Sequence, residues 1–424
     1  MNKRSILVAF AASGLLAFPA AGPAAALPAG IAGIPIALPG AGGAPATGAD
    51  GQAKAGGSDG NLYAATNGLL GNAIRTFHRN PDGTLRLVGD TPTGGTGSNT
   101  FESSANGVVL GGLTGESSPN NLTDQEKFLF AVNTGSNSVS VLRANGDRPK
   151  LIETEATGGH PLSVTVSRNL VYVLNGGLTN GMGLPPSITG YRLSPAGTLT
   201  PIPGSTQPVS GGVISGSTQV SFNPAGDVLV VTEKTANVIS TYRVGPDGVA
   251  GPPITNANSP GSVGPFGFTF TKAGQLLSAQ NFGGLPLLGG ASSFTINADG
   301  TLTPLTSTIS NGQSDTCWIV VTDDQRFAFT TNAQSNTISS YRVGPDGRLT
   351  LLAGVAARTD ELPGVGPTIL PADITLSRDS RFLYERNVMD GDVNAYAVGS
   401  DGSLTLLQRI NGALPLGAIG VAGA

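Results

Sequence analysis

Residues 317–343 read CWIVVTDDQRFAFTTNAQSNTISSYRV, and this stretch decides the fold class. It holds two β-rich segments, Trp318–Val321 and Phe327–Asn332, and a third that ends at Tyr341. A short polar turn separates the first two segments. Runs of β-branched and aromatic residues bounded by turn residues are typical of antiparallel strands. The stretch therefore predicts consecutive strands joined by tight turns.

The central segment of this stretch is one of seven similar windows, each β-rich and each ending in a polar residue. The windows are Leu62–Asn67, Phe128–Asn133, Leu170–Asn175, Val228–Glu233, Leu276–Asn281, Phe327–Asn332 and Phe382–Asn387. Each is followed by a second β-rich segment and then by a turn such as Pro246-Asp247-Gly248. Glycine at the end of such a turn can take the positive φ that a hairpin requires. Each window is thus predicted to be part of a four-stranded antiparallel unit.

Seven four-stranded units predict an all-β fold, a seven-bladed β-propeller. The first unit lacks a leading strand, because residues 51–60 are too polar and too rich in glycine to supply one. Residues 415–421 resemble the strands that open other units. We therefore expect the C-terminal strand to pair with the first unit and to close the ring.

The N-terminal residues predict export. Lys3 and Arg4 precede an apolar run, and Ala24-Ala25-Ala26 fits a signal-peptide cleavage site. We expect a signal peptide over residues 1–26, a flexible Ala/Gly/Pro-rich leader over residues 27–58, and the propeller over residues 59–424. The predicted location is periplasmic or extracellular.

The composition limits the partners and the covalent chemistry. Charged residues make up 12% of the chain, the formal net charge is −4, and no Lys/Arg cluster is present. Nucleic acid and a basic membrane-binding patch are therefore not expected. Cys317 is the single cysteine, so the sequence predicts neither a disulfide nor a lipid anchor at the cleavage site. We expect a monomer without a membrane anchor.

Several strings resemble one known family. They are GSNSVSVL, YRLSPAGTLTPIPGST, VVTEKTANVISTY and the stretch quoted first. Together they resemble the secreted branch of the β-propeller lactonases, which includes 6-phosphogluconolactonase-like and carboxymuconate-cyclase-like proteins. The resemblance covers roughly residues 60–424. It implies a site at one mouth of the central channel, where a His, a Glu and Arg residues open or close a lactone ring without a metal.

Transferring that pattern selects two catalytic candidates. Glu233 stands where the family often has Glu in a V-N-E-L-type string, and His160 partly matches a His-Pro-His string. Thr218 and Gln219 stand where the enzymes have Arg and His, and Leu162 replaces the second His of the other string. The resemblance thus implies Glu233 and His160 as catalytic residues.

The residues themselves leave alternatives open. Glu233 is the single carboxylate among seven strand ends and can act as a general base, or pair with Lys234. Arg386 can hold a carboxylate, stabilise an oxyanion or form an ordinary salt bridge. Trp318 can line a sugar-binding funnel or pack between blades. Cys317 reads as inert packing. His160, one of two histidines, fits a turn or hydrogen-bonding role better than a catalytic one.

One face of the predicted ring concentrates these candidates. The connections over Asn175–Tyr191 and Asn281–Phe294 are long. They share a face with Glu102, His160, Gln219, Asp315, Asp373 and Arg386. Of these, Gln219, Arg386 and Asp373, together with Trp318, are the predicted substrate-binding residues. No nucleotide-binding loop, zinc signature or Ca²⁺ loop is found, so no cofactor and no metal are predicted.

Two functions fit these observations. The first is an exported lactonase-like hydrolase that opens a sugar-type or other small lactone at the channel mouth. The second is a noncatalytic propeller that binds a polysaccharide or a protein partner there.

Overall fold

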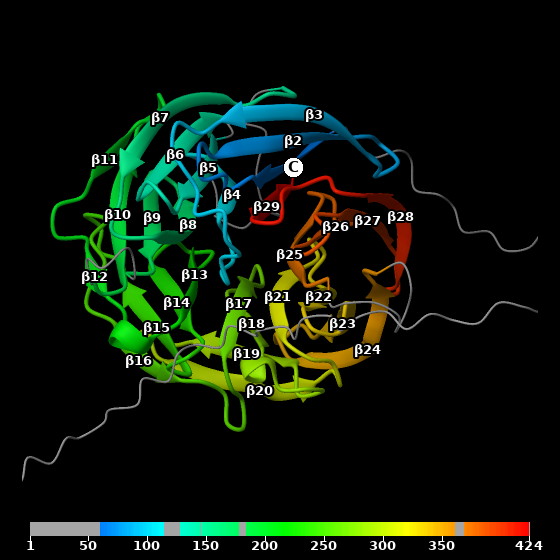
Figure 1. The fold of residues 1–424 in the computed structure, drawn as a ribbon. Helices are drawn as coiled ribbons and strands as arrows, with labels where there is room; N and C mark the ends of the chain where they lie inside the picture. The colour runs from blue at the N-terminus through cyan, green and yellow to red at the C-terminus, as the bar shows by residue number, and fades with distance from the viewer. Residues whose placement is uncertain (1–59, 114–127, 145, 178–183, 361–368, 424) are drawn as a thin grey trace, which may run out of the picture. The chain divides into compact units, whose positions relative to one another are not determined.

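The computed structural model describes residues 60–113, 128–144, 146–177, 184–360 and 369–423. These residues form seven antiparallel sheets arranged as the blades of a ring (Figure 1). The predicted signal peptide and leader lie outside the described residues. No helix in the described part of the chain is long and apolar enough to cross a membrane.

Blades one to seven are numbered in the order of their second strands along the chain. The innermost strands are β29 (Ile419–Gly423), β4 (Val108–Gly111), β8 (Pro161–Ser167), β13 (Ser217–Phe222), β17 (Pro265–Phe270), β21 (Thr316–Val321) and β25 (Pro371–Leu376). The second strands are β1 (Gly60–Ala65), β5 (Phe128–Asn133), β9 (Leu170–Asn175), β14 (Val228–Glu233), β18 (Leu276–Gln280), β22 (Phe327–Asn332) and β26 (Phe382–Asn387).

The outer half of each blade is formed by its third and fourth strands. The third strands are β2 (Ala73–Arg79), β6 (Ser138–Arg143), β10 (Ser187–Leu193), β15 (Val238–Arg243), β19 (Gly290–Ile296), β23 (Thr337–Val343) and β27 (Val393–Val398). The outermost are β3 (Leu85–Pro92), β7 (Lys150–Ala156), β11 (Leu199–Pro201) with β12 (Gln207–Pro208), β16 (Ile254–Ala257), β20 (Leu302–Ser310), β24 (Leu349–Arg358) and β28 (Leu404–Ile410). Two 3-10 turns, η1 (Gly212–Ile214) and η2 (Phe282–Gly284), lie between strands.

The seven-bladed fold is confirmed, and five predicted windows have the limits of β5, β9, β14, β22 and β26. The other two windows end earlier than predicted. Asn67 has a left-handed backbone with φ of 54°, which ends β1 before it. Asn281 caps η2 by accepting a hydrogen bond from the Gly283 N–H, so β18 stops at Gln280.

Ring closure by the C-terminal strand is also confirmed. Strand β29 pairs antiparallel with β1, and Tyr63 lies opposite Ala422. The strand begins at Ile419, four residues later than predicted for its first residue. The physical reason is a turn, in which the Ala418 N–H donates to the Pro415 carbonyl at 3.0 Å. Two segments from opposite ends of the described chain therefore form one blade (Figure 1).

The core lies within and between the blades. All six residues of β5, β14, β22 and β26 are buried, because these strands are covered by neighbouring blades on both faces. Outer strands such as β7 and β28 are partly exposed. The turns between second and third strands, and the connections from each outer strand to the next inner strand, lie on one face, which we call the mouth face.

Candidate functional site

A short segment crosses the channel opening on the mouth face. Residues 98–106, which we call the plug, lie between β3 of blade one and β4 of blade two. The Ala105 N–H donates to the Thr218 carbonyl of blade four at 3.0 Å. The Trp318 indole N–H of blade six donates to the Ser104 carbonyl at 3.2 Å. The plug therefore links blades on different sides of the ring and covers the channel.

The channel beneath the plug is narrow. The space in it that is open to water is about 60 Å³, whereas ordinary ligand pockets hold about 300 to 1,000 Å³. Gln219, Trp318 and Asp373, three of the predicted substrate-binding residues, line it. The Gln219 amide is already used, because it donates to the Phe268 carbonyl and accepts from the Phe268 N–H, both at 2.8 Å. A sugar-sized ligand does not fit in this space.

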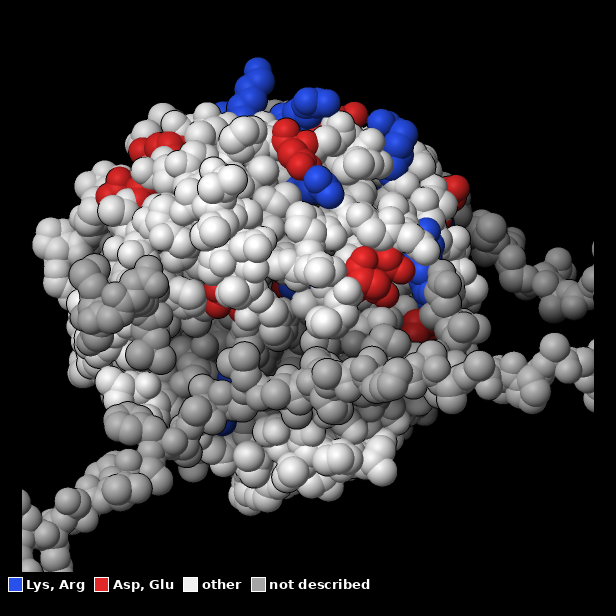
Figure 2. Space-filling view, viewed as in Figure 1, with Lys and Arg blue, Asp and Glu red and all other residues white. Residues whose placement is uncertain are grey.

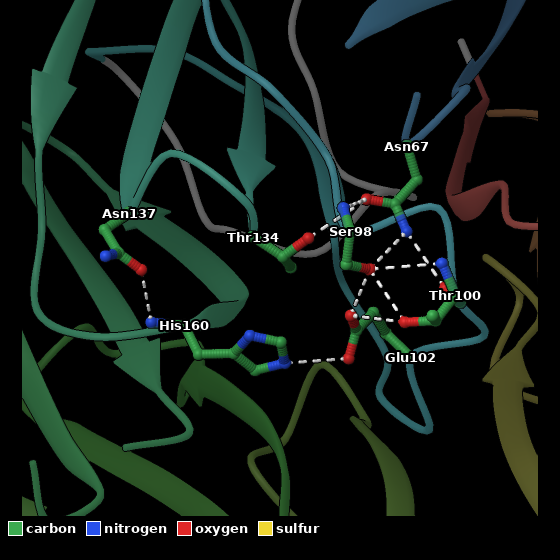
Figure 3. Close-up of polar contacts among 7 residues, drawn as sticks. All are labelled: Asn67, Ser98, Thr100, Glu102, Thr134, Asn137 and His160. Atoms are coloured by element: carbon green, nitrogen blue, oxygen red, sulfur yellow. Dashed lines mark hydrogen bonds and ion pairs between the residues drawn. The ribbon is translucent and has the colours of Figure 1, made fainter. Parts of the chain in front are cut away.

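The plug brings Glu102 to His160. The His160 Nε2 and Glu102 Oε2 atoms are 2.9 Å apart, and Figure 3 shows the ring and the carboxylate directed at each other. Ser98 donates to the other carboxylate oxygen, Glu102 Oε1, at 2.5 Å. Burial by itself raises the pKa of Glu102, but the hydrogen bond and charge of His160 and the hydroxyls of Ser98 and Thr100 lower it overall. The carboxylate is thus ionised at neutral pH.

The backbone fixes His160 in this position. Its φ is 56°, and its N–H donates to Asn137 Oδ1 at 2.8 Å (Figure 3). A positive φ is uncommon for a residue with a side chain. Six inner strands follow such a residue, at Asn106, His160, Gly216, Gly264, Asp315 and Leu370. The left-handed position is therefore a feature of the repeat, and in blade three it carries a histidine.

The Glu102–His160 pair has the arrangement of a general base. A carboxylate that holds one imidazole nitrogen orients the ring and stabilises the imidazolium, which leaves the other nitrogen to accept a proton. Among the described residues, His160 Nδ1 has no hydrogen-bond partner, and about a fifth of the side chain (22%) is exposed. The pair is thus reachable from the mouth face.

Lys234 contacts the plug at the residue after Glu102. Its Nζ donates to the hydroxyl of Ser103, the residue after Glu102, at 2.5 Å, and lies 5.0 Å from the centre of the Phe266 ring. Burial lowers the pKa of Lys234, and the nearby Cys317 and Asp315 oppose that shift. Two consecutive residues of the plug therefore contact a base and a cation: Glu102 contacts His160, and Ser103 contacts Lys234.

Cys317 is an unreactive thiol in this environment. It donates to Asp315 Oδ1 at 3.2 Å, and burial together with the Asp315 carboxylate raises its pKa well above the ordinary value. Burial also raises the pKa of Asp315. A protonated thiol is a poor nucleophile, so the contacts agree with the packing role expected from the sequence.

Glu233 is placed differently from His160. It is fully buried and accepts hydrogen bonds from the Gly211 N–H at 2.7 Å, the Ser210 N–H at 3.2 Å and the Ser240 hydroxyl. Burial raises the pKa of Glu233, and these three hydrogen bonds counteract that rise only in part. Neither oxygen contacts His160 or the plug. The catalytic role of Glu233 stays a prediction, and its contacts are those of a structural residue.

Other blades use the same strand-end position in the same way. Asn133 Nδ2 donates to Ser140, and its Oδ1 accepts from Thr93 in the connection before the blade. Asn332 Nδ2 donates to Ser339, and its Oδ1 accepts from Asn311. Glu233 likewise joins the preceding connection to the serine seven residues later. In these three blades the strand-end residue thus forms hydrogen bonds both to its own blade and to the connection that leads in from the preceding blade.

Arg386 and Asp373 lie inside the ring closure and apart from the Glu102–His160 pair. Arg386 Nε is 3.9 Å from Asp373 Oδ2, and both side chains are buried. Asp373 also accepts from the Gly420 N–H of β29 at 2.9 Å. Burial raises the pKa of Asp373 to about 6, although Arg386 and Gly420 oppose the shift. Their predicted role in substrate binding is untested.

The sequence selected His160, but it did not identify its closest partners as functional. The sequence pattern places Glu102 on the functional face without indicating a role, and it suggests Lys234 only as an ion-pair partner of Glu233. The contacts of Glu102 and Lys234 both depend on the path of the plug, for which the sequence has no signal beyond small and polar residues between two strands.

Trp318 packs between the rings of Phe101 and Phe266, at centroid distances of 6.5 and 4.9 Å. Among the described residues, no group of three His, Cys, Asp or Glu side chains is placed to hold a metal ion.

Comparison with known proteins extends the fold assignment. No protein-family model matches the chain, and no curated protein matches it. The periplasmic gluconolactonase of Pseudomonas aeruginosa superposes with a TM-score of 0.62 at 19% identity, over 87% of this chain and 99% of that one. A protein of Lactobacillus plantarum gives 0.61 at 19% identity, over 87% and 100%. A candidate 6-phosphogluconolactonase of Bacteroides fragilis gives 0.61 at 16% identity, over 87% and 98%. The predicted likeness to propeller lactonases is thus confirmed at the level of the fold.

Proposed function

We propose that this chain is an exported hydrolase that opens a lactone ring on its mouth face, with His160 as the general base. The observation that carries the proposal is the 2.9 Å contact between His160 and the buried, ionised Glu102. A fold shared with proteins described as lactonases supports the reaction class. The exposed side of the imidazole supports access for a small substrate.

In the proposed reaction, His160 Nδ1 removes a proton from a water molecule that attacks the lactone carbonyl carbon. Glu102 stabilises the imidazolium that results. Lys234 is the cation available to the carbonyl oxygen as it becomes an oxyanion. The ring C–O bond then breaks, and the leaving alkoxide takes the proton back from His160. The product is a hydroxy acid, so all atoms of the lactone and one water are accounted for.

The proposed location is the periplasm or the extracellular space. It rests on the basic, apolar and small-residue pattern of residues 1–26, which lie outside the described residues. Sequencing the N-terminus of the protein recovered from outside the cytoplasm tests it. We expect the mature chain to begin after Ala26.

The reaction is tested by measuring ring opening of a broad lactone panel by titration of the released acid. We expect His160→Gln to lower kcat/KM by about 100-fold or more, the usual contribution of a general base. We expect Glu102→Gln to lower it too, because a neutral amide does not stabilise the imidazolium. The matched control is His78→Gln. His78 lies on β2, away from the channel mouth, and its Nδ1 atom is 3.0 Å from Asp147 Oδ1.

Two results would contradict the proposal. One is an unchanged kcat/KM in His160→Gln. The other is the absence of ring opening across the whole panel, which would favour the noncatalytic alternative, a propeller that binds a polysaccharide or protein. Glu233, Gln219, Trp318, Asp373 and Arg386 have no assigned step in this reaction.

A further inference from the structure

The mouth face exposes aliphatic side chains on its loops. Examples that are more than about two-fifths exposed are Leu70, Val213, Ile214, Val263, Leu287 and Leu416. Soluble proteins expose single apolar residues routinely, but apolar residues gathered on one face mark a binding surface. In these loops the side chains come from five different connections around the same opening.

Backbone contacts connect these loops to the candidate site. The Thr235 N–H donates to the Ser215 carbonyl at 3.1 Å, which places Ile214 and Val213 beside the turn that carries Lys234. The Leu287 N–H donates to the Ser314 hydroxyl at 3.0 Å, next to Asp315. The loop of Ile214 therefore lies beside the turn of Lys234, and the loop of Leu287 lies beside the residue before Asp315.

Further contacts join these loops to one another and to the plug. The Phe282 N–H donates to the Val263 carbonyl at 2.9 Å, which joins that loop to the one that carries Leu287. Gly417, the neighbour of Leu416, packs against the backbone of Asn99 in the plug. The exposed aliphatic residues thus lie around the plug and its two polar groups.

The charges of this face do not suit a phosphorylated or strongly anionic ligand. Most of the described surface in view in Figure 2 is formed by residues other than Lys, Arg, Asp and Glu. In the described loops of the mouth face, Lys234 is the single lysine or arginine. The turns of the opposite face, in contrast, include Arg148, Lys272, Arg326 and Arg348. Phosphate recognition normally uses several such donors.

Two asparagine side chains of this face are held by hydrogen bonds within the protein. Asn67 is bonded to Ser98 and to the Thr100 carbonyl, and Asn137 accepts from the His160 N–H. Recognition of a polyol requires free donors and acceptors, because each unpaired hydroxyl that is buried costs free energy. A hydrocarbon chain has no such requirement and gains from covering exposed aliphatic surface.

We infer that the preferred substrate is a lactone with an alkyl or acyl chain, its ring at the Glu102–His160 pair and its chain on the aliphatic loops. This inference rests on the proposed function. Burial of one methylene is worth a factor of about four in affinity when it is complete. A chain lying on loop surfaces is buried in part, so we expect kcat/KM to rise about twofold per methylene until the loops are covered.

The test compares kcat/KM for γ-lactones with side chains of increasing length and for D-glucono-1,5-lactone, all with the same purified protein. We expect a steady rise with chain length, and the long-chain lactones to exceed the gluconolactone by at least tenfold. The double variant Ile214→Ser/Leu287→Ser should remove most of this rise. Leu87→Ser is the matched control, because Leu87 is a half-exposed leucine on the outer strand β3, away from the mouth-face loops.

The outcomes separate this inference from the proposed function. A preference for gluconolactone that still depends on His160 would overturn the alkyl-chain inference and leave the hydrolase intact. A chain-length dependence that persists in the double variant would also overturn it. If no lactone is opened, the proposed function itself fails.

Discussion

Glu233 and Glu102 are both buried carboxylates on the mouth side of the ring, yet their partners give them different capacities. Glu233 accepts from two backbone N–H groups and a serine hydroxyl, none of which is a base at neutral pH. Glu102 bonds to an imidazole with a nitrogen left over. At the scale of the residue, the identity of the partner decides whether a carboxylate supports catalysis.

Replacing Glu233 with glutamine tests this distinction. The amide NH2 group would face one of the present donors, which leaves a buried donor unpaired and should lower the free energy of unfolding by about 1–3 kcal/mol. The kcat/KM of the folded variant should stay within about twofold of the wild type. Urea unfolding and a lactonase assay on the same sample check both values. Lost activity with unchanged stability would instead restore Glu233 as the base.

Glu385 in β26 makes the stability of the protein depend on pH. Burial raises its pKa to about 8, and the hydrogen bond from Asn394 opposes this only in part. In the unfolded chain the pKa is about 4.3. Between these values the folded state holds a proton that the unfolded state has lost, so the free energy of unfolding falls as the pH rises from about 4 to about 8. Asp373, with a pKa of about 6, adds a fall of the same sign in the lower part of this range.

The variant Glu385→Gln should flatten this dependence, because its amide stays neutral at every pH. At pH 9 we expect it to exceed the wild type in free energy of unfolding by more than about 1.4 kcal/mol, the equivalent of one pKa unit. At about pH 3, where Glu385 is neutral in both the folded and the unfolded chain, the two proteins should be similar. Urea titrations at several pH values measure the difference. Parallel curves for the two proteins would show that Glu385 ionises freely in the folded state.

At the scale of the element, a strand and the residue before it have separate tasks. The inner strands supply the wall of the channel, and a left-handed residue shortly before six of them turns the chain onto the mouth face. Since asparagine, aspartate, histidine, leucine and glycine all occupy that position, its side chain is not fixed by the fold. The repeat thus provides positions on the mouth face where chemistry can vary.

Strand β29 has the most direct effect on stability, because it joins the two ends of the ring. Deleting residues 413–424 removes the inner strand of blade one and exposes the hydrogen-bonding edge of β1. We expect a large fall in the unfolding midpoint and a broader transition in urea. Unchanged unfolding would contradict closure by this strand.

A finer variant separates local strain from loss of the strand. Gly420 has φ of 64°, and a Cβ there would lie 2.4 Å from the Val108 N atom, so Gly420→Ala should destabilise the ring as well. Gly71→Ala is its control, because no atom lies within 4 Å of a Cβ at that position.

At the scale of the whole molecule, the plug and the distribution of side chains make the two faces of the ring different. The plug covers the channel on one face and contacts His160 of one blade through Glu102 and Lys234 of another through Ser103. Around it the loops expose aliphatic groups, and the charged turns lie on the opposite face. The expected preference for alkyl-substituted lactones follows from this asymmetry and from no single residue.

The sequence by itself determined the repeat, and therefore the fold. Seven windows, their hairpin turns and the missing first strand specify the blades and the closing strand, because strand pairing within a blade is local and follows alternation and turn chemistry. It also selected His160. Only the tertiary structure decided which carboxylate His160 meets, since Glu102 and His160 are far apart in the chain and meet through a plug without a repeat pattern. The same structure buried Glu233, because a strand end that resembles a mouth residue in sequence faces the neighbouring connection once the blades pack together.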